Sequence, residues 1–85
     1  MTYAVDWTTE ACAHLATCWL LDPPNRSAIT AAQARFDHLL AANPLANGVH
    51  VSEGLYAINE YPLRAVYEVN EADHAVLVVG VGRLI

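Results

Sequence analysis

The C-terminal stretch Leu63–Ile85 constrains the fold most strongly, and it reads LRAVYEVNEADHAVLVVGVGRLI. Two runs rich in valine, leucine and tyrosine, residues 63–70 and 74–84, are separated by the polar triplet 71–73. This arrangement predicts a β-hairpin. The second run is apolar at odd and even positions alike, which is typical of a strand covered on both faces in the middle of a sheet. We therefore expect the rest of the chain to pair with this strand or to cover it.

Residues 3–7 and 8–22 predict a short strand followed by a helix. Large apolar residues alternate along residues 3–7, as in a strand with one buried face. Thr8 or Thr9 offers an N-cap hydroxyl, and Glu10 places a negative charge in the first turn of the helix. Asp22 and the two prolines after it end the helix. Its apolar stripe comprises Cys12, Leu15, Ala16, Trp19 and Leu20.

A second helix is predicted between a cap at Asn25 or Ser27 and a stop at Asn43-Pro44. The short polar turn between the two helices predicts a helical hairpin lying across a sheet. The apolar stripe of this second helix comprises Ile29, Ala32, Phe36, Leu39, Leu40 and Asn43.

Residues 49–51 and 55–58 also have strand character, and Ser52-Glu53-Gly54 interrupts them. We interpret the interruption as a bulge or kink in one strand. The predicted order is therefore β-α-α-β-β-β in a single domain, 1–85. The fold class is α+β, with a three- or four-stranded, mainly antiparallel, twisted sheet. The helical hairpin is expected on one face of that sheet, with the first strand at its edge.

Charge excludes one broad class of function. The 85 residues include nine carboxylates and four arginines but no lysine, for a net charge of −5. A field of this sign repels phosphate backbones, so a basic nucleic-acid-binding face is excluded, while a local patch of arginines stays open. No run approaches the roughly 18 apolar residues of a membrane span. The start of the sequence lacks the basic residue and apolar run of a secretory signal. We therefore expect a cytoplasmic protein that has no membrane partner.

Thiols and imidazoles form no strong motif. Cys12 and Cys18 are six residues apart, so on a helix they point away from each other, and we expect buried free thiols. His14 and Cys18 are four apart and share a helix face, but a third metal ligand is missing from the pattern. No metal site and no other cofactor is predicted.

The combined pattern resembles a known family. A short strand ends in tryptophan, a helical pair ends in NP, and the segments EGLYAI, PLRAVYEVN and VLVVGVGR follow in that order. This order and spacing resemble the RelE/ParE superfamily of toxins from bacterial type II toxin–antitoxin modules, which includes plasmid stabilisation proteins. The resemblance covers nearly the whole chain and is strongest over Asn43–Arg83.

The resemblance implies a cognate antitoxin protein as partner and allows a homodimer. RelE-like members cut mRNA on the ribosome without a metal, whereas ParE-like members poison DNA gyrase. By context, Arg64 and Arg83 match arginines of the RelE type. The chain departs from that type because it lacks lysine and ends two residues after Arg83. These departures disfavour RNA cleavage, so the expectation leans away from an enzyme.

The candidate catalytic residues are Arg64, Arg83 and His50. RNA cleavage needs cations beside the phosphate, which the two arginines could supply, and a base for the 2′-hydroxyl. Candidates for that base are His50, Glu53, Glu60 and Tyr61. The alternative for Arg83 is a cross-strand ion pair with Glu60, which would have the same sequence pattern.

Three functions remain open at this point. The favoured one is a toxin-like component, ParE-like or diverged, that acts through protein–protein contact. The first alternative is a ribosome-dependent mRNA endonuclease of the RelE kind. The second is a non-toxic, diverged homologue with a binding or structural role.

Overall fold

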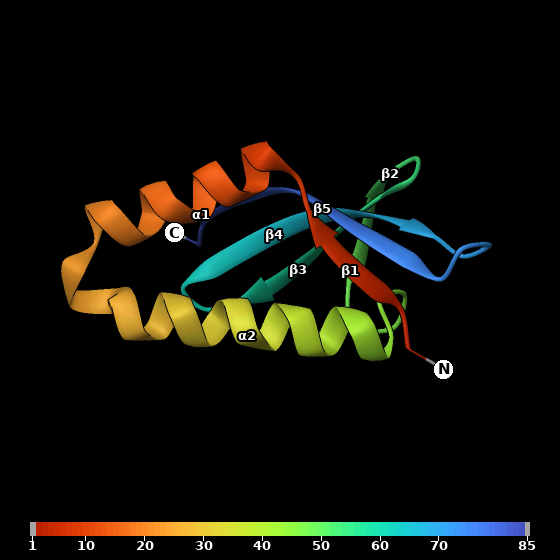
Figure 1. Ribbon diagram of the computed structural model, residues 1–85, viewed down its shortest axis with the longest axis horizontal. Coiled ribbons are helices and arrows are strands. Elements are labelled where there is room, and N and C mark those ends of the chain that lie inside the picture. Colours follow the sequence, from red (N-terminus) through yellow and green to blue (C-terminus); the bar gives the residue numbers. More distant parts are fainter. Residues whose placement is uncertain (1, 85) are drawn as a thin grey trace.

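The computed structural model describes residues 2–84 as one sheet with two helices packed on it. Met1 and Ile85, the ends of the predicted domain, lie outside the described residues. Figure 1 shows the predicted α+β arrangement, with the helical hairpin α1–α2 beside the twisted sheet. The elements in chain order are β1 (Ala4–Trp7), α1 (Thr9–Leu21), the 3-10 turn η1 (Pro23–Asn25), α2 (Arg26–Ala42), β2 (Val49–Ser52), β3 (Leu55–Glu60), β4 (Leu63–Asn70) and β5 (Ala75–Arg83).

The strand order across the sheet is β1-β5-β4-β3-β2. Strand β1 pairs with β5 in parallel, and all the other neighbouring strands are antiparallel. The predicted C-terminal hairpin is β4–β5, and β5 lies inside the sheet as its two apolar faces indicated. The first strand is at the edge, also as predicted.

The segment 49–60 differs from the prediction of one bulged strand. It forms a hairpin, in which β2 turns back into β3 and Ser52 pairs with Leu55. Gly54, in the turn, has a φ of 77°, a conformation that glycine adopts without a steric penalty. The interruption at residues 52–54 is therefore a tight reversal, and the sheet has five strands instead of three or four.

Helix α2 supplies most of the helical contribution to the core. Its buried residues are Ile29, Ala32, Phe36 and Leu40, which confirms the main part of the predicted stripe. Residues from every strand except β2 complete the core. Those packed in it include Ile58, Leu63, Ala65, Tyr67, Val76, Val78 and Val81, with Val5 and Trp7 partly buried against them.

Helix α1 begins as predicted but buries a different face. The Thr8 hydroxyl accepts a hydrogen bond from the Ala11 amide at 3.0 Å, which caps the helix. Ala11 is the buried residue of α1. The expectation of two buried thiols is wrong for Cys12, which is exposed, although both cysteines are free. Helix α1 runs beside β5, where the Val81 amide donates a hydrogen bond to His14 Nδ1 at 3.3 Å.

Tyr67 on β4 is the largest fully buried side chain. Its hydroxyl donates a hydrogen bond of 2.5 Å to the Pro44 carbonyl, so it ties the sheet to the loop after α2. A methyl group at Gly48 would overlap this hydroxyl and would lie 2.8 Å from Tyr67 Cζ. Burial, followed by the nearby Tyr56, raises the pKa of Tyr67 from 10.0 to about 12.

The raised pKa predicts a loss of stability in alkali. Below about pH 10 the Tyr67 hydroxyl is protonated in both states, so its contribution is fully present. Between about pH 10 and 12 the unfolded chain releases this proton while the folded chain retains it, so the free energy of unfolding falls. Urea unfolding across this window should show a shallower decline for Tyr67→Phe than for wild type. Tyr61→Phe, at an exposed position, is the control and should keep the wild-type slope; an unchanged slope in Tyr67→Phe would contradict the assignment.

Close packing predicts a second effect, at Gly48. Gly48→Ala should lower the free energy of unfolding by about 1–3 kcal/mol, because the new methyl group displaces the Tyr67 ring. Gly82→Ala is the control, since nothing lies within 4 Å of the added atom, and it should change stability by less than about 0.5 kcal/mol. Adding Tyr67→Phe should recover part of the Gly48→Ala loss. Equal losses in the two alanine variants would refute the steric explanation.

Candidate functional site

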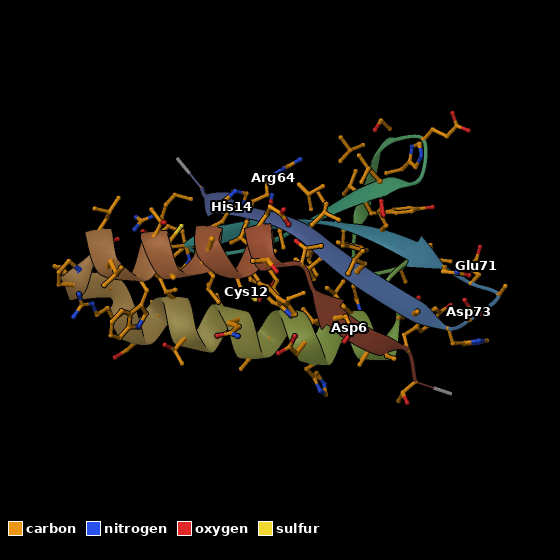
Figure 2. The ribbon with its side chains drawn as sticks, turned by 45° about the horizontal axis from the view of Figure 1, so that its top comes forward. Asp6, Cys12, His14, Arg64, Glu71 and Asp73 are labelled. Atoms are coloured by element: carbon orange, nitrogen blue, oxygen red, sulfur yellow. The ribbon has the colours of Figure 1, made fainter. Side chains whose placement is uncertain are left out.

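Arg64 lies near the start of β4, opposite Asn59 on β3 and Gly82 on β5. Its side chain is exposed, and Figure 2 shows it on the outside of the sheet. Its one hydrogen bond among the described residues is a long one, 3.4 Å from Nη1 to Asn59 Oδ1. Gly82 presents no side chain beside it, so the guanidinium is accessible to a ligand.

Arg83 is engaged within the chain. It lies opposite Leu63 and forms an ion pair with Asp22, the residue that follows α1. The predicted ion pair between Arg83 and Glu60 is wrong. Glu60 instead accepts a hydrogen bond from Arg35 Nε of α2 at 2.6 Å. A second nitrogen of Arg35 donates to the Tyr61 carbonyl at 3.2 Å. Both arginines therefore link the ends of sheet strands to the helical hairpin.

His50 lies on β2, away from the candidate arginines. The ring centroids of His50 and Tyr56 are 5.3 Å apart in an edge-on arrangement. The rings of Tyr56 and Tyr67 are stacked, with their centroids 5.8 Å apart. His50 pairs with Tyr56, and Tyr56 with Tyr67, so these three residues share one face of the sheet. Since side chains alternate along β4, Arg64 is on the opposite face from Tyr67. Arg83 pairs with Leu63, so it lies on the same face as Tyr67 and on the opposite face from Arg64.

The three predicted catalytic residues therefore do not converge. Arg64 is on a different face of the sheet from the other two, Arg83 is paired with Asp22, and His50 packs on the edge strand β2. Their catalytic roles stay a prediction.

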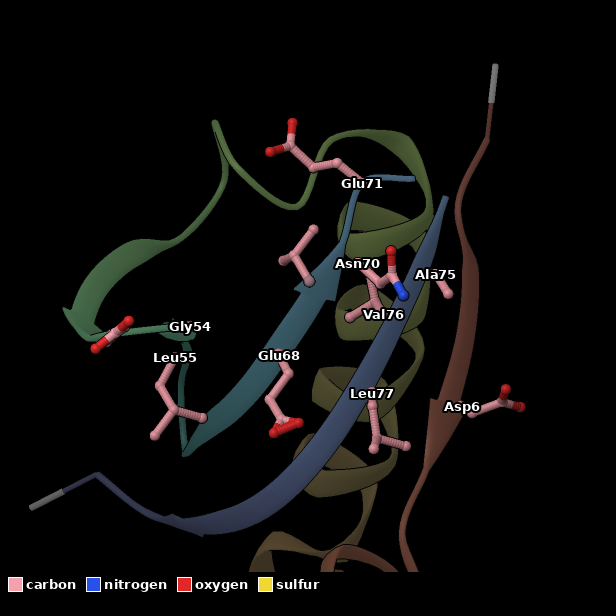
Figure 3. A pocket seen from close by; sticks show the side chains of 11 residues that line it. Asp6, Gly54, Leu55, Glu68, Asn70, Glu71, Ala75, Val76 and Leu77 are labelled. Carbon is pink, nitrogen blue, oxygen red and sulfur yellow. The ribbon is translucent and has the colours of Figure 1, made fainter. Parts of the chain in front are cut away.

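The face of the sheet that carries Arg64 is otherwise acidic. Figure 3 looks onto this face, with α2 behind the sheet. One cross-strand row reads Asp6, Leu77, Glu68, Leu55, from β1 through β5 and β4 to β3. Together with Glu53 and Glu71 these residues line a shallow depression of about 600 Å³. Among residues 2–84, none of these four carboxylates forms a salt bridge.

A second hollow, apolar in character, lies between α1 and α2. We define it as the helical groove; it is lined by Cys12, Leu15, Ala16, Trp19, Leu20, Ile29, Thr30 and Gln33. Trp19 is 40% exposed, Leu20 62% and its neighbour Leu21 80%. Arg26 lies over the Trp19 ring at 4.1 Å and donates a hydrogen bond to the Trp19 carbonyl at 2.9 Å.

The helical groove changes the interpretation of the α1 stripe. The stripe predicted for the core from Cys12 to Leu20 is largely exposed. The sequence carried one signal for this outcome. Helix α1 contains a single charged residue, Glu10, which is unusually few for a helix with a solvated face. Exposed apolar area of this kind marks a contact surface.

Within the described chain, no three histidine, cysteine or carboxylate side chains are placed to hold a metal ion. His14 Nδ1 faces the Val81 amide, so its hydrogen-bonding role is within the fold. Neither α1 nor α2 meets the length and apolarity needed to cross a bilayer.

The similarity of this chain to known proteins lies in its structure. The sequence matches no protein-family model and no curated protein sequence. The structure matches a chain of the toxin–antitoxin complex RelBE2 from Mycobacterium tuberculosis with a TM-score of 0.81 and 21% identity, covering 99% of this chain and 93% of that one. This chain has the RelE/ParE fold.

Two further matches represent both branches of the RelE/ParE fold. A chain of the chromosomal ParDE system of P. aeruginosa aligns with a TM-score of 0.74 and 15% identity, over 98% of this chain and 97% of that one. A mutant of the E. coli toxin RelE in the free state gives 0.72 and 20%, over 98% and 84%. The predicted resemblance to RelE/ParE toxins is thereby confirmed for the fold.

Proposed function

We propose that this protein is the toxin-like component of a type II toxin–antitoxin module and acts through protein–protein contact. The observation that carries the proposal is the helical groove. It leaves Trp19 and Leu20 exposed on a helix with a single charged residue. Burial of this apolar area against another protein lowers the free energy, so such a surface favours a protein contact. A phosphate backbone offers little apolar area to bury, so the groove suits a protein target.

The charges of the chain support contact over RNA cleavage. Two of the four arginines, Arg35 and Arg83, are paired with carboxylates of the same chain. Arg26 is held against Trp19 by hydrogen bonds to backbone carbonyls. That leaves Arg64, whose face of the sheet also carries the acidic depression, and carboxylates on that face disfavour the approach of a nucleic acid.

The fold comparisons suggest the partners. RelBE2 of M. tuberculosis and ParDE of P. aeruginosa are toxin–antitoxin systems, and RelE with RelB forms a complex in Pyrococcus horikoshii. The proposal therefore includes a cognate antitoxin and a cytoplasmic location. The target would be an enzyme bound through the helical groove, with DNA gyrase as the ParE-like example.

One observation favours the mRNA-endonuclease alternative. Arg64 is exposed, has no carboxylate partner among the described residues and faces the open position at Gly82. A guanidinium in this setting can bind phosphate in a bidentate manner. The alternative would still need a base and a second cation on the same face. The charged side chains that line the depression on that face are carboxylates, so they supply no second cation.

Induction of the wild-type chain in its native host separates these functions. We expect growth to slow while mapping of mRNA 5′ ends finds no new cleavage sites. Cells carrying the empty vector are the control.

Two other outcomes would contradict the proposal in different ways. New ribosome-dependent 5′ ends that disappear in the Arg64→Ala variant would establish the endonuclease. Unchanged growth at a verified protein level would instead support the non-toxic homologue.

A further inference from the structure

The outer edge of β5 changes where β1 ends. Strand β1 pairs with β5 as far as Val78. On the other side, β4 pairs with Val78 and then with Gly80, so Val79 is an extra residue, a β-bulge. The bulge shifts the alternation of the backbone groups by one residue. The amide that points out of this edge beyond β1 is therefore that of Val81.

His14 of α1 supplies the acceptor for this amide. The Val81 N–H donates to Nδ1 at 3.3 Å, and a methyl group at Gly80 would lie 3.7 Å from the same nitrogen. Figure 2 shows His14 where α1 runs beside β5. A ring nitrogen accepts a hydrogen bond only when it carries no proton. The contact therefore requires the neutral imidazole with its proton on Nε2.

The contact depends on the charge of His14. In the imidazolium both ring nitrogens are donors, so Nδ1–H and the Val81 N–H would face each other. Protonation removes the hydrogen bond and leaves the amide of Val81, a residue only 9% exposed, without its acceptor. An amide in this position is unfavourable. Histidine side chains take up a proton between about pH 8 and 5.

Helix α1 relies on polar contacts because it buries little of its surface. One of its 13 residues is buried. At the start of the helix the Thr8 amide donates to the Val78 carbonyl at 2.9 Å, and at its end Asp22 pairs with Arg83. The hydrogen bond of His14 lies between these two contacts. It is the contact of the three that mild acid removes.

We infer that His14 is a pH-sensitive latch that holds the middle of α1 against β5. The neutral ring fixes this part of the helix, and protonation of the ring releases it. Leu15, Ala16 and Trp19, which follow His14 on α1, line the helical groove. Acid therefore also changes the shape of the groove. The latch lies within the chain, so it goes beyond the proposed function and does not rest on it.

Ionisable groups of both signs surround the latch. Glu10 precedes His14 by one turn of α1 and favours the imidazolium, whereas Arg64, which pairs with Gly82, disfavours it. The charge of Arg83 is balanced by Asp22. The titratable and charged residues of the elements around the ring are Glu10 and Cys18 on α1, Asp6 on β1, Arg64 on β4 and Arg83 on β5.

The test is a titration of the whole, isotopically labelled chain between about pH 8 and 5, followed by nuclear magnetic resonance. The ring signals of His14 report its protonation, and amide signals report the backbone. We expect the Val81 amide and the amides of residues 15–20 to shift with the midpoint of the His14 ring. The protection of the Val81 amide from hydrogen exchange, corrected for the intrinsic effect of pH, should fall at least about threefold.

Two asparagine variants separate the latch from other titrations. His14→Asn offers an amide oxygen, which accepts a hydrogen bond at any pH in this range. The protection of Val81 in this variant should change by less than about twofold across the titration. His38→Asn removes an exposed histidine of α2 and should keep the wild-type response.

Three results would overturn the inference. They are a Val81 amide in the wild type that does not respond to pH, a response whose midpoint differs from that of the His14 ring, and a full response in His14→Asn. The first two are measured on the wild-type chain, so they decide the question even if a variant does not fold. No partner and no growth assay is involved, so the latch and the proposed function can fail separately.

Discussion

The structure depends on the pairing of β5 with two different strands. Along Ala75–Arg83 it pairs antiparallel with β4, and its first half also pairs in parallel with β1. The partner on that outer edge changes after Val78, and α1 continues where β1 ends, with His14 accepting the Val81 amide. The register with β4 shifts at the same place, between Val66 and Tyr67. Both helices are placed by this strand, since α1 follows β1 directly and α2 packs on the face that β5 shares with β4.

Local patterns along the chain predicted the parts of the fold that local physics determines. The β4–β5 hairpin, the Thr8 cap and the buried stripe of α2 each follow from the spacing of residues that are near one another in the sequence. The β2–β3 hairpin was missed because Ser52-Glu53-Gly54 fits a bulge as well as a reversal. Only pairing between Ser52 and Leu55 distinguishes the two.

The candidate site was less predictable, because its geometry depends on contacts between distant segments. An ion pair for Arg83 was foreseen, but its partner, Asp22, is brought near by the helical hairpin and not by the sheet register. The apolar stripe of α1 was recognised, yet periodicity alone does not tell whether such a stripe meets the core or a partner protein. The cross-strand row Asp6, Leu77, Glu68 and Leu55 joins four strands, so it becomes visible only with the strand order.

Two surfaces with different chemistry remain after the fold is formed. The helical groove is apolar and almost free of charge, whereas the Arg64-bearing face is polarised by its carboxylates and one guanidinium. The helical groove is the surface on which the proposed contact with a protein target rests. The three predicted catalytic residues, Arg64, Arg83 and His50, do not meet at one place.

The most direct test of contact against catalysis compares growth after induction of three variants. Leu20→Asp introduces a charge into the helical groove, and Leu21→Asp introduces it at the neighbouring exposed position outside the groove lining. The third variant combines Arg64→Ala and Arg83→Ala. We predict that Leu20→Asp abolishes growth arrest, while Leu21→Asp and the double arginine variant retain it at equal protein levels. Loss of arrest in the double arginine variant, with arrest retained in Leu20→Asp, would contradict the account.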